Sequence, residues 1–111
     1  MSKKLSFTYD DKEYTLEFTR NSIRQMERQG FVIDEVEKKP MTNLPALFAG
    51  SFIANHNTVK RDKIEKIYDL MNDKTKLFSA LTEMYGETLE SLMESPDEGN
   101  LEWTPNWETE N

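Results

Sequence analysis

The stretch Leu5-Ser-Phe-Thr-Tyr-Asp-Asp-Lys-Glu-Tyr-Thr-Leu-Glu-Phe18 carries the strongest pattern in the chain. Apolar and polar residues alternate on both sides of a polar centre, which is typical of two half-buried strands joined by a tight turn. A two-residue loop at Asp11 and Lys12 would set three apolar pairs on one face: Tyr9 with Tyr14, Phe7 with Leu16, and Leu5 with Phe18. We therefore predict an antiparallel β-hairpin that helices cover on its apolar face, because an isolated hairpin is only marginally stable in water.

Four longer helices are expected after the hairpin, from apolar residues at helical spacing. They cover about residues 20–29, 43–57, 62–71 and 74–93, with one helical turn over 34–39 before the second. The residues expected to begin the first three by capping are Thr19 or Asn21, then Thr42, then Asp62 with Glu65 in capping-box spacing. Gly30 is placed to end the first helix, whereas Gly86 in the last helix is either a break or a tolerated residue.

Together these elements predict an α+β fold. Residues 1–94 are expected to form one domain, in which the N-terminal antiparallel β-hairpin packs on a bundle of about four α-helices. Residues 95–111 are expected to form a flexible acidic C-terminal tail. The helix expected over 43–57 is apolar on nearly all sides and should lie at the centre of the bundle.

Composition excludes several classes of function. The 111 residues include 14 Lys and Arg against 21 Asp and Glu, and a net charge of −7 repels phosphate backbones. The absence of cysteine excludes disulfides, thiolate zinc sites and cysteine nucleophiles. The single histidine, His56, ends an apolar helix and is expected to have a capping or core role. We therefore expect no enzymatic activity, no catalytic residue, no cofactor, no metal site and no nucleic acid partner.

Neither a targeting segment nor a membrane span is expected. The chain begins Met-Ser-Lys-Lys, but the residues that follow alternate instead of forming a continuous apolar stretch. Residues 44–54 form an apolar run of only about ten residues, short of the roughly 20 that a bilayer requires. The expected location is therefore the cytoplasm.

The end of the chain differs from the rest. From Ser95 to Asn111 there are five acidic residues and no Lys or Arg, and both tryptophans of the protein lie there. One interpretation is a terminal strap, in which Leu101, Trp103 and Trp107 fold back onto the body. The other is a short linear motif that docks these three apolar side chains into a partner. The two interpretations are compatible, and these three residues are the candidate partner-binding site.

Lys60, Arg61, Lys63 and Lys66 form the only basic cluster and follow a short turn after a helix, as in a helix-turn-helix protein. Acidic residues interleave with them and would face the same phosphates. We therefore interpret the cluster as a solvated face of an amphipathic helix.

Several short motifs together carry a resemblance to a protein family: residues 5–9, Lys12-Glu-Tyr-Thr-Leu-Glu-Phe-Thr-Arg20, Met26-Glu-Arg-Gln-Gly-Phe31, Pro40-Met-Thr-Asn-Leu-Pro-Ala-Leu-Phe-Ala-Gly50 and Glu98-Gly-Asn-Leu-Glu-Trp-Thr-Pro105. Over nearly its full length the chain resembles a family of small uncharacterised proteins from phages and prophages of Gram-positive bacteria. Members of that family look like tail assembly chaperones of long-tailed phages.

The resemblance implies a specific role. Such chaperones coat the hydrophobic, helical tape measure protein in the host cytoplasm before the tail tube polymerises, and they are absent from the mature virion. In related systems a longer frameshifted product recruits tail tube protein. The resemblance supplies no catalytic residues.

A second function remains open. An acidic phage protein could inhibit or regulate a host protein by occupying its nucleic-acid site. Such a mimic is expected to spread its acids in an ordered stripe, whereas most of the net charge here lies in residues 95–111. That distribution favours the chaperone.

Overall fold

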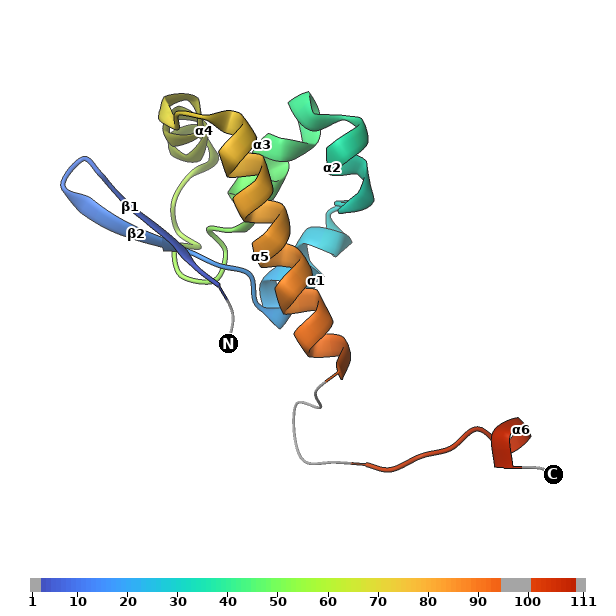
Figure 1. The fold of residues 1–111 in the computed structure, drawn as a ribbon. Helices are drawn as coiled ribbons and strands as arrows, with labels where there is room; N and C mark the ends of the chain where they lie inside the picture. Colours follow the sequence, from blue (N-terminus) through green and yellow to red (C-terminus); the bar gives the residue numbers. More distant parts are fainter. Residues whose placement is uncertain (1–2, 95–100, 110–111) are drawn as a thin grey trace.

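An antiparallel β-hairpin begins the fold and helices follow it in the rest of the described residues (Figure 1), which confirms the predicted α+β class. The computed structural model describes residues 3–94 and 101–109, so part of the predicted tail (95–100 and 110–111) lies outside the described residues. The elements are β1 (Leu5–Tyr9), β2 (Lys12–Leu16), α1 (Arg20–Arg28), α2 (Asp34–Lys38), α3 (Pro40–Gly50), α4 (Arg61–Leu70), α5 (Lys74–Glu94) and α6 (Asn106–Thr109).

The hairpin has the predicted buried face but not the predicted register. Leu5 pairs with Leu16 and Phe7 with Tyr14, so the turn lies at Asp10–Asp11. The prediction of a turn at Asp11–Lys12 was wrong. Each residue of β1 pairs with a residue two positions earlier than predicted, and a shift of two residues keeps the same side chains facing the core. Asp10 and Asp11 have φ values of 54° and 64°. A tight hairpin turn needs positive φ at both central residues, which aspartate tolerates better than lysine.

Helix α1 begins and ends much as the sequence predicts. Thr19 is the N-cap and forms a capping box with Ser22, each side chain accepting a hydrogen bond from the other residue's backbone N–H. Gly30 ends the helix with φ 95°. The N–H groups of Gly30 and Phe31 donate to the carbonyls of Glu27 and Met26, which is the pattern of a Schellman motif.

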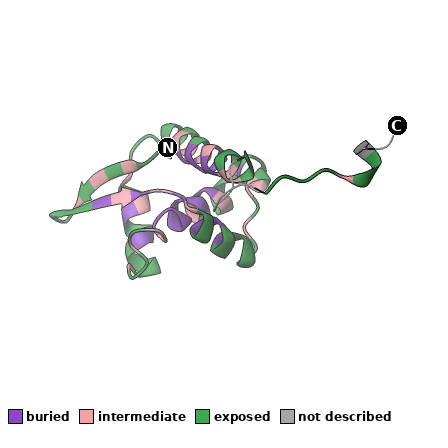
Figure 2. Ribbon diagram, turned by 90° about the horizontal axis from the view of Figure 1, so that it is seen from below, coloured by how far each residue is buried: buried purple, intermediate pink, exposed green. Residues whose placement is uncertain are grey.

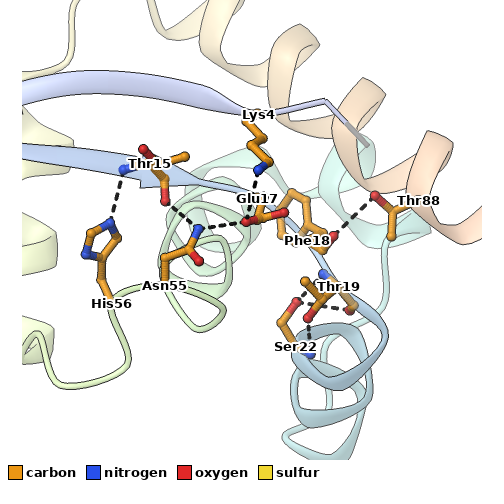
Figure 3. A network of polar contacts seen from close by, with 9 residues as sticks. All are labelled: Lys4, Thr15, Glu17, Phe18, Thr19, Ser22, Asn55, His56 and Thr88. Carbon is orange, nitrogen blue, oxygen red and sulfur yellow. Dashed lines mark hydrogen bonds and ion pairs between the residues drawn. The ribbon is translucent and has the colours of Figure 1, made fainter. Parts of the chain in front are cut away.

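Helix α3 begins earlier and ends earlier than predicted. It starts at Pro40, whose fixed φ and missing N–H suit the first helical position, so Thr42 lies inside the helix and is not its cap. It ends at Gly50 instead of Asn57 because the following turns form hydrogen bonds with strand β2. His56 Nε2 accepts from the Thr15 N–H at 3.0 Å, and Asn55 donates to the Thr15 carbonyl at 3.1 Å (Figure 3).

Local residues explain where α4 and α5 begin. The N-cap of α4 is Lys60, whose side chain makes no capping hydrogen bond. Asp62 lies in the first turn of the helix and not before it, so the predicted capping box of Asp62 with Glu65 does not form. Asp73 caps α5 by accepting from the Lys76 N–H at 3.1 Å. Helix α5 runs through Gly86 without a break, which answers the question that the sequence left open.

The core lies where the hairpin and helices α1 to α5 face one another (Figure 2). Its largest fully buried hydrophobic side chains are Tyr14, Leu16, Phe18, Val36, Leu47, Phe48, Phe52, Ile67, Leu81 and Tyr85. Helix α5 is fastened to the N-terminal region by polar contacts: Thr88 donates to the Phe18 carbonyl at 3.3 Å, and Lys3 pairs with Glu83 and, at 3.5 Å, with Glu87.

The apolar run at residues 44–54 belongs to α3 and the turns after it, and most of it is buried in this core. Within residues 3–94 and 101–109, no helix combines the length and the apolar character needed to cross a membrane.

Candidate functional site

The three predicted partner-binding residues lie together on the C-terminal segment and are largely exposed. The exposed fractions are 88% for Leu101, 78% for Trp103 and 79% for Trp107. Trp107 lies in α6, a short helix that the sequence analysis did not predict. At these exposures the three side chains make little contact with the core, so the structure does not place them as a strap.

This segment combines apolar area with negative charge. Tryptophan buries a large rigid surface on docking and loses little conformational entropy, which is why it is enriched at the centres of interfaces. Glu102 lies between Leu101 and Trp103, and no Lys or Arg occurs after Ser95. We call residues 101–109 the aromatic segment.

The other exposed large apolar residues are spread over the fold: Val32, Met41, Leu70 and Met93. Singly exposed apolar residues are ordinary on a protein surface. The aromatic segment differs because three such side chains occur within seven residues.

Glu83 and the histidine of the body have structural partners. Lys3 donates to Glu83, and this contact holds the pKa of the Glu83 carboxyl below its usual range and that of Lys3 above it. His56 packs its ring 5.0 Å from that of Tyr14, between centroids, consistent with the expected core role. Among the residues that the structure describes, no three His, Cys, Asp or Glu side chains group so that they could hold a metal ion.

A second feature was missed by the sequence analysis. A pocket of about 590 Å³ lies between the hairpin tip and the start of α4. We call it the lysine pocket; its lining residues are Tyr9, Asp10, Lys12, Tyr14, Thr58, Val59, Lys60, Asp62, Lys63 and Lys66. Lys60, Lys63 and Lys66 are exposed, as expected of a solvated face, and they also line this pocket. Their proximity to Lys12 is a long-range contact that no local sequence signal reveals.

A family model described as a domain of unknown function (DUF5055) matches residues 1–107, and the chain belongs to this family. The match includes both the body and the tryptophans of the aromatic segment. No curated protein and no solved structure matches the chain.

Proposed function

We propose that this DUF5055 protein is a non-enzymatic chaperone of phage tail assembly, which binds the tape measure protein and keeps it soluble. It would act in the cytoplasm of the bacterial host and be absent from the mature virion, with tail tube protein as a second partner. The observation that carries the proposal is the exposure of Leu101, Trp103 and Trp107 at the end of the chain. The resemblance of the short motifs to proteins that look like tail assembly chaperones supports it.

The aromatic segment suits reversible capture of an amphipathic helix. A tape measure protein awaiting assembly exposes apolar helical faces, and large aromatic side chains dock on such faces through apolar contact. Ordering the segment on docking costs conformational entropy, so the complex would be of modest affinity. Modest affinity allows the chaperone to leave when tube subunits arrive.

The charge of the chain supplies the second requirement, which is solubility of the complex. A net charge of −7 on 111 residues opposes association between complexes. Because the aromatic segment is flanked by acids and not by lysines, an apolar partner with basic residues beside its apolar face would be preferred.

Co-expression with a tape measure protein of a long-tailed phage tests the proposal. The expected result is that the tape measure protein moves from the insoluble to the soluble fraction and co-purifies with this chain. The double variant Trp103→Ala/Trp107→Ala should lose most of this effect. Leu70→Ala is the matched control, because Leu70 is also an exposed apolar residue (68%) but lies on α4, outside the segment.

Two results would count against the proposal. A tape measure protein that stays insoluble and uncomplexed beside the intact chain would refute the chaperone role. Equal solubilisation by the double tryptophan variant would assign binding to the body instead of the aromatic segment.

A further inference from the structure

The lysine pocket joins two regions that are far apart in the sequence. The turn and first residues of β2 supply Asp10, Lys12 and Tyr14 to one side, and residues 58–66 supply the other. The volume of about 590 Å³ is enough for one or two side chains of a peptide.

Tyr14, one of the residues that line this pocket, carries an unsatisfied polar group. The residue is 0% exposed, its ring stacks on Phe7 with centroids 5.3 Å apart, and it lines the lysine pocket. Its hydroxyl is buried and has no hydrogen-bond partner within residues 3–94 and 101–109. A buried hydroxyl without a partner is unfavourable, so an acceptor that displaces the atoms covering it would gain a hydrogen bond that the described part of the body does not provide.

The charges around the hydroxyl favour an anionic acceptor. Lys12, Lys60, Lys63 and Lys66 line the pocket against two aspartates, Asp10 and Asp62. Lys12 Nζ lies 5.4 Å from the centroid of the Tyr14 ring, and in the part of the chain that the structure describes none of the four lysines is paired with a carboxylate. The uncapped N-terminus of α4 adds positive potential at Lys60.

We propose that the lysine pocket binds the acidic C-terminal segment of a second copy of this chain, through a carboxylate that accepts a hydrogen bond from the Tyr14 hydroxyl. Residues 95–111 carry five acids and no base, the opposite charge to the pocket. The exposed Trp103 and Trp107 flank such acids and would contact Tyr9 and the lysine side chains at the rim.

The geometry favours a second copy over the same chain. The hairpin tip and the C-terminal end of α5 lie at opposite ends of the fold (Figures 1 and 2). Helix α5 has 21 residues and therefore spans about 31 Å. A chain returning along it would use about nine fully extended residues and would leave only the residues after Trp103 to dock, whereas in the structure Trp103 and Trp107 are exposed and are not docked on their own body.

Docking in this manner is head to tail, because the donor segment and the pocket are different surfaces. The interaction should weaken as salt screens the lysines. It uses the same tryptophans that the proposed function assigns to the tape measure protein, so the two partners would compete for the segment. The tests below contain no tape measure protein, so each proposal can fail separately.

A fluorophore-labelled peptide of residues 95–111 tests the site on the intact protein by fluorescence anisotropy. Saturable binding at low salt is expected, with affinity falling about tenfold in Lys63→Gln/Lys66→Gln. The control variant is Lys38→Gln/Lys39→Gln, at the end of α2 and outside the pocket. It removes the same amount of positive charge and should leave the affinity for the peptide unchanged. A peptide with its acids replaced by amides but both tryptophans kept should not bind.

Tyr14→Phe separates a binding role from a structural one. The ring is retained and an unpaired hydroxyl is removed, so the variant should be at least as stable as the wild type yet bind the peptide several-fold more weakly. Sedimentation velocity of the full chain at low salt should show mass rising with concentration, and Lys63→Gln/Lys66→Gln should abolish the rise. Equal peptide affinity in the lysine variants would overturn the site, and a full chain that stays monomeric would overturn docking on a second copy.

Discussion

Gly50, the last residue of α3, packs directly against the side chain of Met26 on α1. A Cβ at position 50 would lie 2.9 Å from Cγ of Met26 and would overlap Sδ and Cε of the same residue. Met26 is only 2% exposed, so its side chain would have to shift within the interior to make room. The absence of a side chain at Gly50 therefore sets how closely α1 and α3 approach.

Two glycine variants test this contact. Gly50→Ala should lower the free energy of unfolding by about 1–3 kcal/mol because it overpacks the α1–α3 contact. Gly86→Ala should raise it by about 0.5–1 kcal/mol, because Gly86 lies inside α5 with open space around it. Urea denaturation measures both, and equal effects of the two substitutions would contradict the described packing.

The hairpin turn gives a second prediction. Asp11 has φ 64°, which glycine adopts without strain, so Asp11→Gly should leave stability unchanged or slightly higher. Lys12 belongs to β2, so Lys12→Gly should be destabilising by about 0.5–1 kcal/mol. Thermal unfolding of the two variants distinguishes the registers: if Lys12→Gly is the tolerated change, the turn lies at Asp11–Lys12.

Stability should also depend on pH through Tyr85. Burial, with a smaller contribution from the negative charge of Glu27, raises the pKa of Tyr85 to about 12. The raised pKa means that the neutral phenol stabilises the fold below about pH 10, the pKa of an unfolded tyrosine, and that this contribution is lost as the pH rises towards 12. Tyr85→Phe should show a smaller loss of stability between pH 10 and 12 than the wild type; an identical pH profile would exclude this role.

The body should fold without the C-terminal segment. Leu101, Trp103 and Trp107 are exposed and contribute little to the core, so truncation after Glu94 should shift the thermal midpoint by only a few degrees. Circular dichroism would record the transition. Loss of cooperative unfolding would show that the segment completes the core after all.

The sequence predicts the hairpin face and most helix positions because these depend on local periodicity and local caps. Thr19 and Gly30 act on their own helix, and period-2 alternation fixes which side of β2 is buried. The register is less constrained, because a shift of two residues keeps every side chain on its face. The early end of α3 was missed because His56 and Asn55 bond with Thr15, about 40 positions earlier in the chain.

The candidate site also has one part that the sequence reveals and one part that it does not. Composition alone singles out Trp103 and Trp107, because two tryptophans in an acidic, lysine-free segment are unusual at any position. The lysine pocket depends on the hairpin tip meeting residues 58–66, and neither region signals this contact. The unpaired hydroxyl of Tyr14 depends on the same contact and becomes visible only in three dimensions.

Tryptophan fluorescence tests the central claim most directly, because both tryptophans of the protein lie in the aromatic segment. We predict that titration with a soluble amphipathic fragment of the tape measure protein moves the emission maximum to shorter wavelengths, with saturation, as Trp103 and Trp107 leave water. Trp103→Ala and Trp107→Ala, made singly, should each reduce the shift and weaken binding. A fragment that co-elutes with the chain while the emission spectrum stays unchanged would contradict capture by this segment.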